Sequence, residues 1–204
     1  QRPFEPGTFK KESLNTSEFA SWCENTHFSD PQWLTLRQMI IFAMEETKTK
    51  YTQEEIFLDC HKAEEALHTL NKMQFEEHHS FSALEPVTTI SSLEKLSFTK
   101  TTVPDLTPLI GSSITKVSLK NMNLKNMAAI PGLLSLGQLT ELNLYQNKIE
   151  SLEPIRHFKN LHSINISRNE INTVEPLADL TELIKVEFFH NNVTDIRPLY
   201  GLSK

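Results

Sequence analysis

The segment Leu139–Asn160, LTELNLYQNKIESLEPIRHFKN, is followed by two more lines of the same pattern. Leu161–Glu182 reads LHSINISRNEINTVEPLADLTE, and Leu183–Lys204 reads LIKVEFFHNNVTDIRPLYGLSK. If the first residue is position 0, apolar residues fall at positions 0, 3, 5 and 10, asparagine at position 8 and proline at position 15. One such unit cannot bury its own apolar side alone, so a fixed period of 22 predicts a stack of similar turns.

The pattern extends back along the chain with more variation. Leu93–Ser113 and Ile114–Gln138 are further copies, the second with three extra residues around Ile130–Leu136, and Leu70–Ser92 is a weaker copy. Six repeats therefore cover about residues 70–204, more than the three that a stable array needs. In the copy that begins at Leu93, position 10 is Val103, which we expect to lie in the core.

Each repeated position has a physical reason. Alternation at positions 3 to 5 predicts a short strand in each repeat. The residue before proline disfavours α-helix, so the returning limb should be extended or 3₁₀. Asn147, Asn169 and Asn191 end the strands, and we expect them to hydrogen-bond backbone groups of their own and neighbouring turns. Thr101 and Met122 occupy that position earlier, so the asparagine ladder should be broken there.

The L-x-x-L-x-L line with its asparagine is the leucine-rich-repeat signature. It predicts an α+β solenoid, a horseshoe of about six repeats with a parallel concave sheet and an N-terminal α-helical cap. The expected divisions are a flexible arm at 1–15, the cap at 16–69 and the repeats at 70–204.

The cap is predicted from helix-start signals. Ser29–Gln32 and Thr52–Glu55 are capping boxes, followed by apolar residues at spacings of three and four. One helix should run to about Glu46 and another into the first repeat, covering the apolar end of the stack.

The two cysteines, Cys23 and Cys60, both fall in this cap and form no CxxC pair or zinc-type set of four. We expect a disulfide, which would contribute on the order of 3–4 kcal/mol in the chain-entropy model and indicate an oxidising compartment. The alternative is two buried, reduced thiols.

The repeats resemble the 22-residue class of internalin-like bacterial proteins. The cap, with FASWC, TLRQMIIFAMEE and LDCHKAEEAL, resembles a two-cysteine helical cap of exported bacterial leucine-rich-repeat proteins. This resemblance covers about residues 18–204. It implies protein binding through the concave face and no catalysis.

Composition excludes several other classes. The net charge is −6 and no basic stripe occurs, so no nucleic-acid partner is expected. No apolar run approaches the length of a membrane span. We expect no cofactor and no metal: His78 and His79 are adjacent, and the segment Glu76–His79 fits a solvated loop better than a metal-dependent enzyme. The chain begins at Gln1 rather than Met, which fits removal of a leader that carried an export signal.

Positions 1, 2, 4, 6 and 7 should face outward. Aromatic side chains and arginine, which dominate interface hot spots, gather in the last three repeats. The expected partner-binding residues are Tyr145, His162, Arg168, Glu187, Phe189 and His190. Lys95, Lys100, Lys116 and Lys120 form a mild positive patch in the earlier repeats.

The predicted function is a non-catalytic protein–protein interaction module, exported to the periplasm or the extracellular space. The alternative is a cytoplasmic scaffold or enzyme regulator that uses the same face. The last repeat lacks a cap, although its apolar residues need a neighbour, so we expect the chain to continue or a second copy to pair there as a homodimer.

Overall fold

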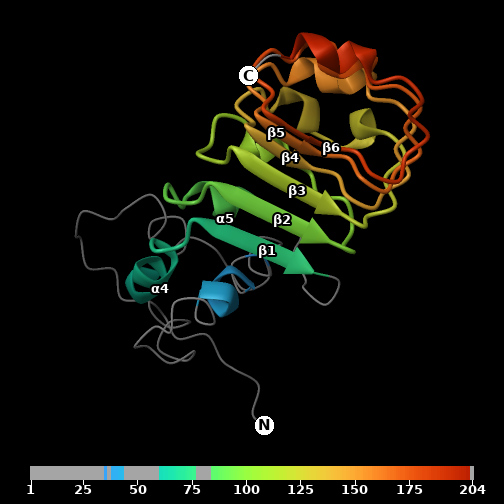
Figure 1. The fold of residues 1–204 in the computed structure, drawn as a ribbon. Helices are drawn as coiled ribbons and strands as arrows, with labels where there is room; N and C mark the ends of the chain where they lie inside the picture. The colour runs from blue at the N-terminus through green and yellow to red at the C-terminus, as the bar shows by residue number, and fades with distance from the viewer. Residues whose placement is uncertain (1–34, 36–37, 44–59, 77–83, 203–204) are drawn as a thin grey trace.

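The computed structural model describes residue 35 and residues 38–43, 60–76 and 84–202. Six parallel strands form one sheet in sequence order. In Figure 1 this sheet forms one side of the repeats, and short helical turns return along the other. The predicted repeat solenoid with a parallel sheet is confirmed. The strands are β1 (Lys72–Glu76), β2 (Lys95–Thr99), β3 (Lys116–Lys120), β4 (Glu141–Asn143), β5 (Ser163–Asn165) and β6 (Lys185–Glu187).

The strands pair in the register of the repeat. Leu96 of β2 lies beside Val117 of β3, and Leu142 of β4 lies beside Ile164 of β5. Equal positions therefore form columns across the sheet, about 4.8 Å apart from one strand to the next. Apolar columns face the core and polar columns face away from it.

The returning limb consists of short turns, as the prolines predicted. All but one of its described helical elements are 3₁₀, and several begin with proline, whose fixed φ suits a first helical position. The exception is α5, a single α-helical turn. The elements are α5 (Glu85–Thr88), η1 (Thr107–Leu109), η2 (Met127–Ala129), η3 (Leu133–Ser135), η4 (Glu153–His157), η5 (Glu175–Asp179) and η6 (Arg197–Gly201).

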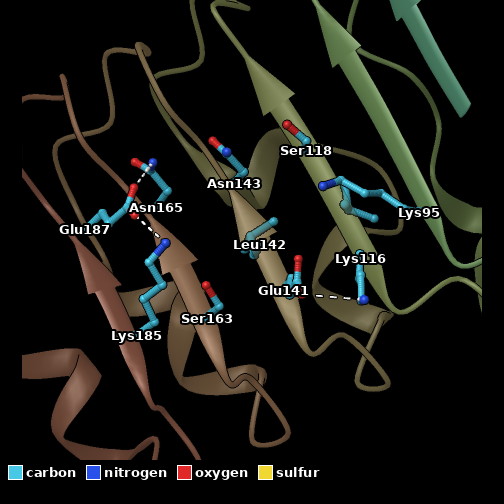
Figure 2. Close-up of a pocket in the computed structure, with 11 residues that line it drawn as sticks. Lys95, Lys116, Ser118, Glu141, Leu142, Asn143, Ser163, Asn165, Lys185 and Glu187 are labelled. Atoms are coloured by element: carbon cyan, nitrogen blue, oxygen red, sulfur yellow. Dashed lines mark hydrogen bonds and ion pairs between the residues drawn. The ribbon is translucent and has the colours of Figure 1, made fainter. Parts of the chain in front are cut away.

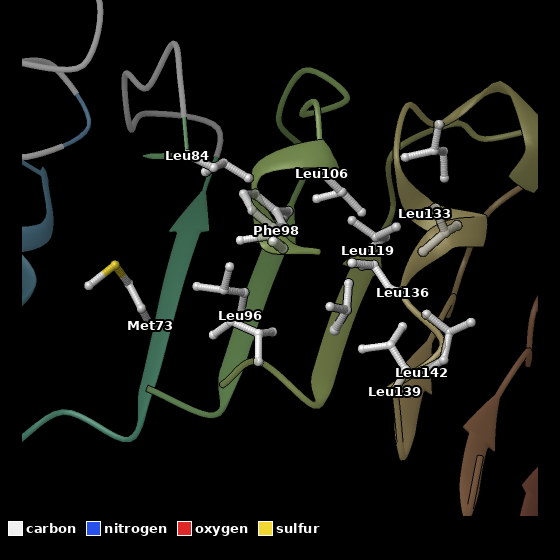
Figure 3. Close-up of a cluster of buried hydrophobic side chains, with 14 of the residues drawn as sticks. Met73, Leu84, Leu96, Phe98, Leu106, Leu119, Leu133, Leu136, Leu139 and Leu142 are labelled. Carbon is white, nitrogen blue, oxygen red and sulfur yellow. The ribbon is translucent and has the colours of Figure 1, made fainter. Parts of the chain in front are cut away.

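One continuous apolar core runs through the described repeats. Figure 3 shows its middle part, where leucines from successive strands and turns meet. Phe75 and Phe98 stack with ring centroids 5.2 Å apart, and both are almost fully buried. Because each repeat contributes to the same core, no single repeat could hold this structure alone.

Asparagine side chains tie successive turns together. Asn169 donates from Nδ2 to the carbonyl oxygens of Leu144, in the preceding turn, and Ile166, in its own turn. Its Oδ1 accepts from the backbone N–H of Ile149. Asn147 and Asn191 make the same three kinds of contact. Each asparagine therefore closes the turn before it as well as its own.

This pattern explains why the expectation for Val103 is wrong. In later repeats, the N–H at position 10 donates to the asparagine of the following turn. For Val103 the corresponding residue is Met122, which offers no amide oxygen. Val103 is 43% exposed, and Leu106, three residues on, is fully buried. Val103 thus lies outside the core where the ladder is interrupted, although Pro104 beside it is buried.

The three extra residues of the third repeat form a loop that reaches back to the second. The N–H of Leu106 donates to the carbonyl oxygen of Pro131 at 2.9 Å. Gly132 follows with φ of 77°, and a Cβ there would lie 2.3 Å from the backbone nitrogen of Thr107. The insertion fits only because this residue has no side chain.

Charged side chains on the returning limb add contacts between turns. Arg156 of η4 contacts Glu153 in its own turn and Glu175 and Asp179 of η5. In the last turn, Asp195 accepts from both the backbone N–H and the guanidinium of Arg197.

Helical residues lie at the β1 end of the sheet (Figure 1). Residues 38–43 are helical, and α4 (Cys60–Leu67) leads into β1. Met39, Ile40 and Leu67 are buried in the same cluster as the repeats. The predicted arm at 1–15 and most of the predicted helix that runs to about Glu46 lie outside the described residues, as do Cys23, His78 and His79.

Candidate interaction face

Positions 2 and 4 of the repeats line the face of the sheet that points away from the core, here called the open face. A polar hollow of about 160 Å³ lies on it across β2 to β6. Figure 2 shows the side chains that surround it. The polar lining consists of Lys95, Lys116, Ser118, Glu141, Asn143, Ser163, Asn165, Lys185 and Glu187.

The β5–β6 half of this hollow is internally paired. Lys185 lies 2.6 Å from Glu187, and Asn165 donates its amide to the same carboxylate. The hydrogen bond and charge of Glu187 raise the pKa of Lys185. Since the charges of Lys185 and Glu187 already neutralise each other, this half of the hollow has little need of a charged ligand.

The β2–β4 half is less well satisfied. Lys116 lies 3.6 Å from Glu141 and 3.9 Å from Glu94, longer than the 2.7–2.9 Å that is typical of a direct charge-assisted hydrogen bond. Ser118 is 2% exposed, and its hydroxyl has no hydrogen-bond partner among the described residues. A buried hydroxyl without a partner is unfavourable.

The predicted binding residues of the last repeats lie mainly where the strands end. Arg168, Phe189 and His190 are exposed, and Tyr145 is half-buried. Phe189 is 71% exposed. The N–H of Arg168 donates to the carbonyl oxygen of Phe189 at 2.7 Å, which fixes these two residues side by side.

The other two predicted residues lie elsewhere. His162 directly precedes β5, six residues before Arg168, so up to about 20 Å of extended chain separates them. Glu187 belongs to the paired half of the hollow. Ser167 corrects the expectation that position 6 always faces outward, because it is 4% exposed and its Oγ accepts from the N–H of Phe189.

Position 7 has a backbone feature that the pattern did not predict. Five residues in this column have left-handed φ values between 51° and 58°: Lys100, Asn121, Gln146, Arg168 and His190. Residues other than glycine and asparagine seldom adopt this conformation. The strand therefore ends in a sharp turn at which Arg168 and His190 project from a strained backbone. No glycine marks this column, so the sequence carried little signal for it.

The lysine residues form a clearer arrangement than the predicted patch. Lys72, Lys95 and Lys116 all occupy position 2 and lie beside one another on β1, β2 and β3. Lys100 and Lys120 lie at the other end of their strands. Comparing position 2 across the repeats would have revealed this row from the sequence.

Within the described ranges, no group of three or more His, Cys, Asp or Glu side chains could hold a metal ion. No helix in the same ranges has the length and apolar character needed to cross a membrane.

Comparisons with known proteins agree with this architecture. The family described as "Leucine Rich repeats (2 copies)" matches residues 137–179. A crystal structure of an internalin (inlF) from Listeria monocytogenes superposes with a TM-score of 0.54 at 26% identity, over 70% of this chain and 41% of that one. A crystal structure of an internalin C2 (inlC2) from the same organism superposes with a TM-score of 0.52 at 18% identity. That superposition covers 95% of this chain and 96% of the inlC2 chain. No curated protein matches in sequence.

The repeat register, the asparagine contacts and the family match define a leucine-rich-repeat protein. The chain spans less than half the length of inlF, and the likeness to inlC2 shows the fold alone. Within this class the chain is similar to the internalin inlF, so the predicted resemblance to internalin-like repeat proteins is confirmed.

Proposed function

We propose that this chain is a non-catalytic protein-interaction module that binds a protein partner through its open sheet face. The observation that carries the proposal is Phe189, which is 71% exposed and bonded through its backbone to Arg168. Single exposed apolar residues are normal on protein surfaces. An exposed phenylalanine beside an arginine, with Tyr145 at the equivalent position two turns earlier, has instead the composition of an interface hot spot.

The proposed contact patch consists of Tyr145, Arg168, Phe189 and His190. Tyrosine and arginine contribute large contact areas with polar tips, and phenylalanine contributes the apolar anchor. Glu187, on the open face, and the exposed His162, directly before β5, would contact the margin of the same partner.

A quantitative pull-down tests this proposal. Immobilised wild-type chain and a Tyr145→Ala, Arg168→Ala, Phe189→Ala variant receive the same protein extract, and recovered proteins are quantified by mass spectrometry. The matched control is one triple variant of the returning limb, in which similar side chains are removed: Tyr200→Ala, Arg197→Ala, His157→Ala. Specific partners should fall at least tenfold with the patch variant and remain with the control. Equal recovery on all three would reject the patch.

We also propose that the protein is exported, to the periplasm or the extracellular space, with Cys23 paired to Cys60. Cys60 is 4% exposed at the start of α4, and Cys23 is the chain's one other cysteine. Protein recovered from its native compartment should resist alkylation until it is reduced, as intact-mass measurement would show. Two freely alkylated thiols would argue instead for a reducing compartment and a cytoplasmic scaffold or regulator.

A second proposed contact lies at the edge of β6, where a continuation of the chain or, as we propose, another copy of it would pair. Ile184, directly before β6, is 63% exposed, and Ile196, directly before η6 in the same turn, is 46% exposed. An unpaired strand edge offers backbone groups for pairing. Light scattering should show a dimer that Ile184→Lys disrupts. A monomer at high protein concentration would count against this contact.

A further inference from the structure

The β2–β4 half of the open-face hollow contains one lysine, Lys95, whose charge no described carboxylate neutralises, beside Lys116, which has only the long contacts to Glu141 and Glu94. Lys95 lies between Lys72 and Lys116 in one row across the sheet. Like charges at directly paired positions are destabilising. Within the described part of the chain, no carboxylate lies within ion-pair distance of Lys95. The nearby carboxylate of Glu141 contacts Lys116 instead, at 3.6 Å.

The groups beside these lysines are also hydrogen-bond donors without acceptors. The Ser118 hydroxyl is buried and has no partner among the described residues. The Oδ1 of Asn143 accepts from the N–H of Tyr145 at 3.0 Å, so its Nδ2 remains available to a ligand. Ser118 and Asn143 are paired neighbours on β3 and β4, and Figure 2 shows both along the same hollow as Lys95 and Lys116.

The missing chemical group is therefore an acceptor with negative charge. We propose that the hollow bounded by Lys95, Lys116, Ser118 and Asn143 binds an aspartate or glutamate side chain of the protein partner. This inference rests on the proposed function, since it assumes that a partner docks on the open face. A carboxylate has about four acceptor positions and no donor, which suits two ammonium groups, a hydroxyl and an amide.

Size and charge favour a carboxylate over a phosphate. The hollow has a volume of about 160 Å³ and includes Glu141 and Glu187, and no arginine lines it. Those two carboxylates would repel a dianion more strongly than a monoanion, and bidentate phosphate recognition usually involves arginine. The Ser118 hydroxyl is buried in the free protein, so the proposed ligand reaches it only if neighbouring side chains of the hollow move when the ligand enters.

A short peptide tests the hollow without the natural partner. Acetyl-Glu-Gly-Glu-Gly-Glu-amide is titrated into the ¹⁵N-labelled full chain, and amide shifts are followed by NMR. The glutamine analogue and a Glu-to-phosphoserine analogue are titrated in parallel. The acidic peptide should shift the amides of Lys95, Ser118 and Asn143 saturably, the glutamine peptide should not, and the phosphopeptide should bind no more tightly than the acidic one. Binding should weaken in high salt, because surface charges are screened.

Variants then locate the effect. The double variant Lys95→Gln, Lys116→Gln should weaken peptide binding at least fivefold. The control double variant Lys125→Gln, Lys159→Gln changes the net charge by the same amount and should leave peptide binding unchanged. Ser118→Ala should weaken binding about threefold without lowering the melting temperature, because the hydroxyl has no partner to lose.

Equal weakening by both lysine pairs, an equal response to the glutamine peptide, or tighter phosphopeptide binding would overturn the inference. If the peptide fails while the pull-down still depends on Phe189, this inference fails and the proposed function stands. If the peptide binds while the pull-down patch fails, the hollow is a carboxylate site and the hot-spot patch is wrong.

Discussion

Asn169 donates a hydrogen bond from Nδ2 to the carbonyl oxygen of Leu144 at 3.0 Å, across 25 residues of sequence. Asn169 is 8% exposed, so water cannot readily replace its amide. The same side chain contacts Ile149 and Ile166. One asparagine thus satisfies backbone groups of two turns, and its loss should affect both.

We therefore expect Asn169→Ala to lower the free energy of unfolding by about 3 kcal/mol, since three buried backbone groups lose a partner. Chemical denaturation would measure the change. Asn191→Ala should cost less, because Asn191 is only half-buried. The exposed neighbour Asn192 is the control, and its replacement by alanine should stay within about 0.5 kcal/mol of wild type. Equal effects at Asn169 and Asn192 would show that the contacts between turns contribute little.

Two glycines with the same φ of 77° should respond differently to a side chain. At Gly132 a Cβ would lie 2.3 Å from the backbone nitrogen of Thr107, while at Gly111 it would meet nothing within 4 Å. Gly111→Ala should cost about 1 kcal/mol, the left-handed strain alone. Gly132→Ala should cost at least about 3 kcal/mol, because overpacking adds to the strain. Thermal unfolding of both variants tests this, and similar melting temperatures would mean that the insertion does not press against the second repeat.

The left-handed residue Gln146, with φ of 58°, offers a stabilising change. Left-handed backbone costs a side-chain-bearing residue about 1–2 kcal/mol, and glycine loses roughly 0.5–1 kcal/mol in entropy. Gln146→Gly should therefore raise the free energy of unfolding by about 0.5–1 kcal/mol. Lys148→Gly, at an exposed position without a left-handed φ, should lower it by a similar amount. Two destabilised variants in urea denaturation would contradict the assigned backbone strain.

Asp195 should remain ionised in strongly acidic solution. The side chain of Arg197, together with its backbone N–H, lowers the pKa of Asp195 from its ordinary 3.8 to about 2. A folded pKa below the unfolded value means that this contact stabilises the protein above about pH 4, and that the stabilisation is lost as the pH falls toward 2. Carboxyl-detected NMR should show the low midpoint, and Arg197→Gln should raise it. An unchanged midpoint in the variant would remove the guanidinium as the cause.

Much of the fold could be predicted because it is periodic. Position 3 is buried in every described strand before β6, and Asn147, Asn169 and Asn191 recur at the spacing at which the structure places them between turns. The aromatic and arginine residues of the candidate site could be recognised in the same way, as columns. The lysine row at position 2 was equally visible in the sequence, but only to a reader who compared that column.

The sequence by itself determined the number of turns, the strand positions and the 3₁₀ return, because each depends on residues that repeat within one turn. The tertiary structure decided what depends on a neighbouring turn. Val103 is exposed because Met122, 19 residues later, cannot accept its N–H. The insertion is held by a glycine that lies against Thr107. The Ser118 hydroxyl is buried without a partner in a hollow whose lining comes from β2 to β6. Contacts between turns couple residues that no single repeat contains, so these three features became visible only when the turns were stacked.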